Sequence, residues 1–274
     1  MSKRARFFII SLILGFFLWL TGLFGVEKRL ALVLSVSGIA YVLSAWVLFE
    51  DLKGWEWVTL LILPVLFTLG TGLFGNLLPS AIPSIFGLSF QIETSLFLGA
   101  VVRFIFVVLY VFGMYAVLLT ENIFSVASIR TIQLFRAARS VSFILALVVS
   151  LFFFAVAFSL KLPFYIIGVI VGLVSLLLSF ESLWSVDLKT EHLDDVYRLS
   201  IVIGWLMGLF GCVISFWPIG PFMGGLVLTS CFYALLGILE QRLVNKMMAV
   251  NYLEFVIFNL IIILIAFLTT SWRG

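Results

Sequence analysis

The chain has very little charge for its length, and this scarcity decides its class. Only 11% of its 274 residues are Asp, Glu, Lys or Arg, whereas a soluble domain carries about 25%. Hydrophobic residues make up 64% of the chain, and the mean hydropathy is +1.30. No soluble core of this length could bury so much apolar side chain, so the solvent must be lipid. The formal net charge of +3 therefore gives no indication of nucleic-acid binding.

The sequence also lacks the residues that membrane enzymes and pumps use. It contains neither H-E-x-x-H nor G-x-x-x-x-G-K-[ST], and its single histidine, His192, lies outside the apolar segments. No apolar segment carries a central carboxylate pair for proton coupling or a lysine for a retinal-type Schiff base. These absences argue against an intramembrane hydrolase and an ion-coupled pump. We expect that the protein is not an enzyme and has no catalytic residue, cofactor or bound metal.

Cysteine is scarce as well. Cys212 and Cys231 lie inside different apolar segments, at different expected depths. A disulfide requires the two Cα atoms to approach within about 7 Å, so we expect none between them.

Long apolar runs, divided by charged residues or proline, predict an all-α protein, a polytopic bundle of transmembrane helices. About nine spans are expected, at roughly 7–26, 30–49, 57–78, 96–119, 141–160, 162–180, 199–217, 221–239 and 252–271. Short connections make consecutive spans antiparallel neighbours. We expect residues 1–274 to form a single integral membrane domain, multi-pass in the cell membrane, with the lipid bilayer as partner.

Positive charges are spread unevenly over the expected connections. With the N-terminus inside, eleven of the 16 Lys and Arg residues fall on the inner side and five on the outer side. Because inner loops of membrane proteins are enriched in these residues, the N-terminus is expected inside. Nine spans then place the C-terminus outside.

The segment 120–140 contains no glycine or proline and mixes apolar with basic residues. We expect it to form an inner interfacial helix or to prolong a neighbouring span. Its Thr-Glu-Asn-Ile-Phe at 120–124, followed by Arg130 and Arg136, resembles a segment of uncharacterised polytopic membrane proteins of small-genome bacteria, a family of unknown function. The resemblance covers this segment and the general layout, and it implies no activity.

Small residues between Gly204 and Gly237 are spaced for close helix packing. Two rows each share one helical face: Gly204, Gly208, Gly211 and Ser215 in the first, and Ser230, Ala234 and Gly237 in the second. Pro218 and Pro221 separate the rows, because proline cannot continue a helix. We expect a tightly packed helical hairpin at the middle of the bundle, with both rows facing neighbouring helices.

The tetrapeptide Gly-Leu-Phe-Gly occurs at 22–25, 72–75 and 208–211, and Thr precedes the first two copies. All three copies fall in odd-numbered spans, which run in the same direction. Two explanations stay open. One is a duplicated helical hairpin, as in transporters built from parallel repeats. The other is a shared use of glycine for close packing.

Four arginines are candidate ligand-binding residues. Arg103 is the only charged residue well inside an expected span, where it binds an outer-leaflet anion or lipid head group, or extends outward to the interface. Arg130, Arg136 and Arg139 form an inner basic cluster. This cluster binds anionic lipids or a membrane protein partner, or serves only to fix the topology.

Acidic residues gather in the segment 181–198. Asp187, Glu191 and Asp194 would share one helix face, which is conceivable for a divalent metal but matches no specific metal motif. Acidic residues favoured by the positive start of the seventh span are the simpler explanation.

Two further polar features remain. The segment 78–94 is apolar but broken by Pro79 and Pro83, so it is either a re-entrant loop or an outer interfacial cap. Asn259, in the last span, is expected to make an interhelical hydrogen bond.

Three classes of function fit these features. The repeat, the glycine rows and Arg103 favour permease-like handling of a lipid or small solute. A structural or assembly subunit of a membrane complex, held by a membrane protein partner, is the alternative. A membrane enzyme using the acidic inner segment is a second alternative.

Overall fold

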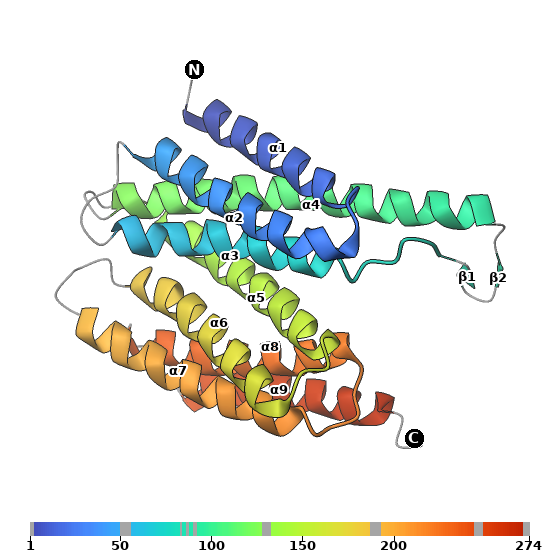
Figure 1. Cartoon of the computed structure of the whole chain (residues 1–274). Coiled ribbons are helices and arrows are strands. Elements are labelled where there is room, and N and C mark those ends of the chain that lie inside the picture. Colours follow the sequence, from blue (N-terminus) through green and yellow to red (C-terminus); the bar gives the residue numbers. More distant parts are fainter. Residues whose placement is uncertain are drawn as a thin grey trace. The chain divides into compact units, whose positions relative to one another are not determined.

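The described chain is all-helical apart from one very short hairpin, as Figure 1 shows. The computed structural model describes residues 3–49, 56–82, 84–85, 88–89, 92–127, 133–186, 193–243 and 249–270. Within these ranges there are nine helices: α1 Lys3–Thr21, α2 Val26–Leu48, α3 Glu56–Gly75, α4 Ile92–Ala127, α5 Phe135–Ser159, α6 Phe164–Trp184, α7 Leu193–Ile214, α8 Pro221–Leu243 and α9 Ala249–Thr269. The strands β1 Ser84–Ile85 and β2 Leu88–Ser89 pair in antiparallel fashion. The all-α prediction is confirmed.

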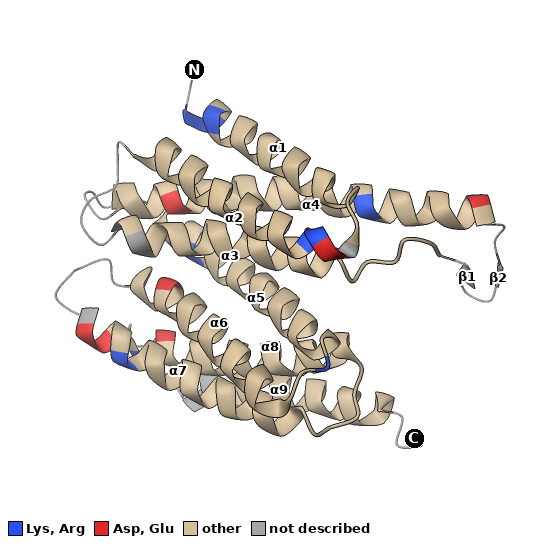
Figure 2. Cartoon of the chain, in the orientation of Figure 1, with Lys and Arg blue, Asp and Glu red and all other residues tan. Residues whose placement is uncertain are grey.

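Seven of the described helices are long and apolar enough to cross a membrane, by length and composition. The apolar segments in α3 and α9, Thr59–Gly75 and Leu253–Thr269, are shorter. In Figure 2, the coloured Lys, Arg, Asp and Glu residues lie mostly toward helix ends. Large apolar side chains, such as Leu260 and Leu268 of α9, are exposed. This distribution is that of a polytopic membrane protein, whose outer helix faces contact lipid.

The fourth helix is longer than the expected span. α4 continues to Ala127, and α5 begins at Phe135 rather than near residue 141. Much of the segment 120–140 therefore prolongs the two neighbouring helices, which is one of its two expected structures. No glycine or proline interrupts either of these helical extensions. Residues 128–132, with Arg130, lie outside the described residues.

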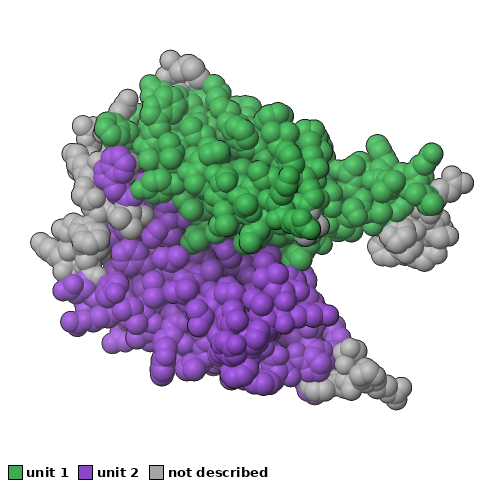
Figure 3. Space-filling model, in the orientation of Figure 1, with its two compact units in different colours: residues 1–50, 64–119 green, residues 51–63, 120–274 purple. Residues whose placement is uncertain are grey.

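The helices group into two compact units, coloured separately in Figure 3. Unit 1 contains residues 1–50 and 64–119, and unit 2 contains residues 51–63 and 120–274. α3 passes from unit 2 to unit 1 at Pro64, where the helix loses a backbone hydrogen bond because proline has no amide proton. That the two units form one membrane domain stays a prediction.

The core of unit 1 is built where α1, α3 and α4 meet. The rings of Phe67 and Tyr110 stack with their centroids 5.5 Å apart, and the Tyr110 hydroxyl lies 2.9 Å from Thr68 Oγ1. Gly15 and Gly113 leave no room for a Cβ, because Val111 and Phe67 respectively pack against them. Helices that approach this closely gain dispersion contacts, which hold a bundle together in lipid.

In unit 2 the first glycine row packs against α6. A Cβ at Gly204 would lie 2.9 Å from the carbonyl oxygen of Gly172, and one at Gly208 would lie 3.0 Å from that of Gly168. Gly211 of α7 packs against Val171, which also belongs to α6. α7 and α8 are joined by a short connection, but α7 packs far more extensively on α6 than on α8.

The expectation that α7 and α8 form the tightly packed pair is therefore wrong. Gly168 and Gly172 of α6 form a G-x-x-x-G row that matches the row on α7, so these two backbones approach closely. In the second row, Gly237 packs against Phe255 of α9, whereas Ser230 is buried and Ala234 and Ser215 are half-buried. The neighbouring Gly225 packs against Ala155, which brings α8 onto α5.

Candidate functional site: a cationic pocket in unit 1

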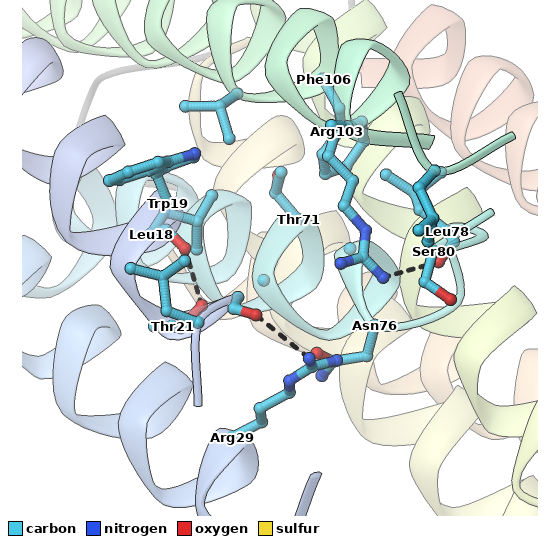
Figure 4. A pocket seen from close by; sticks show the side chains of 17 residues that line it. Leu18, Trp19, Thr21, Arg29, Thr71, Asn76, Leu78, Ser80, Arg103 and Phe106 are labelled. Carbon is cyan, nitrogen blue, oxygen red and sulfur yellow. Dashed lines mark hydrogen bonds between the residues drawn. The ribbon is translucent and has the colours of Figure 1, made fainter. Parts of the chain in front are cut away.

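A cavity of about 280 Å³ lies within unit 1 (Figure 4). Its walls come from the end of α1, the start of α2, the end of α3 with the residues that follow it, and the first half of α4. Both Thr-Gly-Leu-Phe-Gly copies contribute to it: Thr21, Gly22 and Leu23 from the first, and Thr71, Gly72 and Gly75 from the second. The two repeats thus share one pocket.

Local packing and turn geometry explain why glycine occupies these positions of the repeats. Gly22 follows the last residue of α1, and its amide donates to the carbonyl oxygen of Trp19 at 3.1 Å, which tightens the final turn. Gly72 lies where α3 meets Val33 of α2 and Leu18 of α1, and these side chains leave no space for a Cβ. This supports the close-packing explanation of the repeat and also forms the pocket wall.

Arg29 fixes the turn between α1 and α2. Its Nε donates to the carbonyl oxygen of Phe24 at 2.8 Å, and its Nη2 donates to that of Gly22 at 3.1 Å. These bonds satisfy carbonyl groups that follow α1, which have no helical donor. They also hold the guanidinium group at the pocket. Because both acceptors are neutral carbonyl groups, the positive charge of Arg29 is not cancelled by these bonds.

Arg103 places a second guanidinium group in the pocket. Its Nη2 donates a long hydrogen bond of 3.4 Å to the carbonyl oxygen of Leu78, and its buried Nε has no hydrogen-bond partner. No carboxylate within the described part of the chain pairs with it. In the view of Figure 4, the Arg29 and Arg103 side chains approach from opposite sides, with Asn76 between them.

Neutral polar groups accompany the two arginines. Thr71 is only 2% exposed, and its hydroxyl has no hydrogen-bond partner. Asn76 and Ser80 also line the cavity. Guanidinium, amide and hydroxyl groups all donate hydrogen bonds, so the polar lining suits an anion with several acceptor oxygens.

The remaining lining is apolar and open to the outside of the helices. Leu18, Phe106 and Val107 form the deeper surface, and Trp19, Leu23 and Leu96 are 44%, 65% and 53% exposed. A pocket with two cationic groups, hydrogen-bond donors and an apolar margin is complementary to an amphiphile with an anionic head.

Comparison with known proteins assigns a family. Residues 30–269 match the model of a family described as protein of unknown function (DUF5656). The chain belongs to this DUF5656 family. No curated protein and no solved structure matches the chain. The region that defines the DUF5656 family includes Thr71, Asn76 and Arg103, whereas α1 and Arg29 precede it.

Two arginines of the inner basic cluster of this DUF5656 protein, Arg136 and Arg139, lie among the described residues. Arg136 is exposed, and Arg139 Nη2 lies 3.0 Å from Glu240 Oε2 in an ion pair. Both arginines line an open groove of about 450 Å³ in unit 2, together with Phe143 and Phe255. The charge of Arg139 is balanced by Glu240. Arg136 is therefore the better candidate of the two to bind an anionic ligand in this groove.

Other predicted residues are placed as follows. Asp187, Glu191 and His192 lie outside the described residues, and Asp194 lies with Asp195 in the exposed first turn of α7. Both cysteines are free, and Cys231 Sγ lies 4.0 Å from Asn259 Oδ1, a weak hydrogen bond between α8 and α9.

After α3, residues 76–82 lead toward the start of α4, and the backbone of Ser80 packs against Gly99. The amide of Ile82 donates to the carbonyl oxygen of Ser95 at 3.0 Å. This segment therefore folds back onto α4, and it brings Leu78 and Ser80 to the pocket. Whether it is re-entrant or a cap stays a prediction.

The sequence analysis missed a group of buried glutamates in unit 2. It found no carboxylate pair within one span, but Glu121, Glu181 and Glu240 come from α4, α6 and α8. Glu121 and Glu181 are 0% and 1% exposed. The signal was available, because each glutamate lies near the end of an even-numbered span, and such ends share one side of the membrane.

Proposed function

We propose that the protein binds an anionic amphiphile in the unit 1 pocket and moves it across the cell membrane in a permease-like manner. The ligand is a membrane lipid or small solute with a phosphate or carboxylate head and an apolar tail. The observation that carries this proposal is Arg103, a half-buried guanidinium group with no acidic partner among the described residues, in an apolar-walled cavity.

The charge of the pocket supports an anion as ligand. A buried guanidinium group loses hydration, and this loss is offset only by a counter-charge or by hydrogen-bond acceptors. The carbonyl oxygen of Leu78 supplies one distant acceptor. A phosphate or carboxylate would supply the missing charge and accept from Nε as well, in the bidentate geometry that arginine favours.

The apolar walls support an amphiphile rather than a free inorganic anion. Trp19, Leu23 and Leu96 lie at the exposed margin of the pocket. In a bilayer such side chains face acyl chains, so a bound lipid could keep its tail in lipid while its head contacts Arg103. None of the described residues that line this cavity carries a carboxylate to repel the head group.

A binding experiment on the full chain tests the proposal. The protein is purified in a neutral detergent, and dissociation constants are measured for phosphatidylglycerol, phosphatidylcholine of the same acyl chains, oleate and inorganic phosphate. We expect tight binding of phosphatidylglycerol or oleate and much weaker binding of the other two. Arg103→Ala should weaken the preferred ligand roughly 10- to 100-fold, since a charged hydrogen bond contributes about 1.5–3 kcal/mol.

Matched variants distinguish ligand binding at Arg103 from a general effect of positive charge on the protein. Arg103→Lys keeps the positive charge but loses the paired donors of the planar guanidinium group, so it should retain part of the affinity. Arg198→Ala removes an exposed arginine of α7 and should leave the affinity unchanged. Flux of the preferred ligand in proteoliposomes should fall with Arg103→Ala. Equal binding of phosphatidylcholine and phosphatidylglycerol, or full affinity in Arg103→Ala, would refute the proposal.

A further inference from the structure

The strongest unexplained feature of unit 2 is a buried carboxyl group without a partner. Glu121, near the end of α4, is 0% exposed, and neither of its carboxylate oxygens has a hydrogen-bond partner among the described residues. Buried carboxylates are normally paired with a cation or with several donors, because losing hydration costs several kcal/mol. A fully buried glutamate with no donor at either oxygen therefore indicates that a positively charged ligand is missing.

A second buried carboxyl group adds to this deficit. Glu181 of α6 lies close enough to Glu121 for their carboxyl groups to interact electrostatically. Glu181 Oε1 accepts a hydrogen bond from Ser142 Oγ of α5 at 2.9 Å, and Ser182 Oγ lies 3.5 Å from its Oε2. Both carboxyl groups are buried, and the donors to Glu181 among the described residues are two neutral serine hydroxyls.

An arginine lies in this region, but it is already engaged. Arg139 of α5 pairs with Glu240 of α8, which in turn lies close enough to Glu181 for electrostatic interaction. Among the described side chains, this group therefore contains three carboxyl groups, Glu181 itself with Glu121 and Glu240, against the guanidinium group of Arg139. Arg139 balances Glu240, and among these side chains no fixed positive charge is left for Glu121 and Glu181.

We propose that Glu121 and Glu181 together bind one monovalent inorganic cation, a hydrogen ion or a sodium ion, beside the Arg139–Glu240 ion pair. Two carboxyl groups and nearby hydroxyl oxygens are ligands that sodium accepts, and a single hydrogen ion can be shared between two carboxyl groups. Within the described residues, no three His, Cys, Asp or Glu side chains are grouped to hold a metal ion, which argues against a multidentate divalent site.

This site lies in unit 2 and does not depend on the pocket of unit 1. Its residues share no member with the Arg103 pocket, so failure of one proposal leaves the other intact. The expected consequence is that cation binding stabilises the folded state, because the ligand binds the assembled pair and not the unfolded chain.

The first test is the thermal stability of the full chain in lipid nanodiscs. Choline, potassium and sodium chloride are compared at equal ionic strength over about pH 5–9. If sodium is the ligand, sodium raises the Tm above its value in choline at high pH. If a hydrogen ion is the ligand, sodium has no effect and the Tm falls as the pH rises, because the bound ion is lost. A Tm that depends on neither ion overturns the proposal.

Two variants test whether the sodium or pH dependence of the Tm arises at Glu121. Glu121→Gln should strongly weaken the sodium or pH dependence, because a neutral amide removes one of the two carboxyl groups that bind the ion. Glu93→Gln, at the exposed other end of the same helix, should leave the dependence unchanged. A full dependence in Glu121→Gln overturns the assignment.

A measurement on the unsubstituted protein decides the case where Glu121→Gln does not fold. Dicyclohexylcarbodiimide modifies protonated carboxyl groups in apolar surroundings, and the modified peptide is identified by mass spectrometry. We expect modification of Glu121 or Glu181, slowed more than tenfold by sodium at fixed pH or by alkaline pH. Modification of neither residue, or a rate that neither condition changes, overturns the proposal.

Discussion

Lys161, in the connection between α5 and α6, is the one non-glycine residue in the described chain with positive φ, at 49°. It follows Leu160, the residue that caps the end of α5, and lies two residues before Pro163, the N-cap of α6. The left-handed conformation costs an L-residue about 1–2 kcal/mol, and β-branched residues tolerate it least. The short turn therefore depends on a residue that accepts this conformation.

We predict that Lys161→Val lowers the free energy of unfolding by about 1 kcal/mol, because a β-branched residue tolerates this conformation less well than lysine, which already bears part of the cost. Lys161→Gly, which removes both the charge and the Cβ, should be neutral or slightly stabilising. The midpoint of helix loss on heating in detergent, followed by circular dichroism, measures both. If glycine destabilises as much as valine, the lysine side chain and not the backbone conformation is what matters.

The Arg139–Glu240 ion pair is the second feature at the residue scale. The two side chains are 23% and 12% exposed. Removing the guanidinium group leaves the largely buried Glu240 without its partner, which costs more than the loss of an exposed pair. This differs from Arg136, which lies one turn earlier on α5 and is exposed.

We predict that Arg139→Ala destabilises the protein by on the order of 2 kcal/mol, discounted from a fully buried pair for partial exposure. Arg136→Ala should change stability by less than about 0.5 kcal/mol. Adding Glu240→Gln to Arg139→Ala should recover part of the loss, because it removes the unpaired charge. Chemical unfolding in mixed micelles compares the four proteins, and equal losses for both arginines would contradict the prediction.

At the scale of elements, the α6–α7 pair depends on glycine because backbone meets backbone. Any side chain at Gly204 or Gly172 would meet a carbonyl oxygen of the other helix at 2.9 Å. Carbonyl groups in a helix cannot move aside as a flexible side chain can. Gly38 of α2, in contrast, has nothing within 4 Å of the position that a Cβ would take.

We predict that Gly204→Leu destabilises the protein by about 1–3 kcal/mol or more through overpacking, which lowers the Tm by several degrees. Gly38→Leu is the matched control: it places the same side chain on an open helix face, and should be neutral or stabilising because leucine favours helix. Thermal scans of both variants decide the matter. A similar loss in both would mean that helix propensity rather than close packing explains the glycine.

At the scale of the whole molecule, the nine described helices and the charge distribution make a topology prediction. With the N-terminus inside, the α5–α6 turn at Lys161 and the α7–α8 turn at Gly220 are both outside. Gln133, before α5, is inside. All three residues are exposed, so a cysteine at each is accessible to a reagent.

In a variant lacking Cys212 and Cys231, we predict that Lys161→Cys and Gly220→Cys react with a membrane-impermeant maleimide in intact cells. Gln133→Cys should react only after the membrane is permeabilised. Labelling is read by a mass shift on a gel. The opposite pattern would show that the N-terminus is outside, and labelling of Lys161 and Gly220 from different sides would show that a helix between them does not span.

The sequence by itself determined the class, and its nine expected spans correspond to the nine helices of the described residues, with many of the same boundaries. Long apolar runs, proline and charge set these features locally, since a chain in lipid must satisfy its backbone hydrogen bonds within each helix. It also indicated Arg103 and the small-residue rows, because charge and side-chain volume are visible in a single segment.

Only the tertiary structure decided which helices meet. It joined the two Thr-Gly-Leu-Phe-Gly copies and Arg29 with Arg103 around one pocket, and it paired the glycine row of α7 with Gly168 and Gly172 of α6. It also buried glutamates from separate helices and brought Glu121 within electrostatic range of Glu181. Periodicity tells which face of a helix is small or polar, but it does not tell which other helix that face contacts.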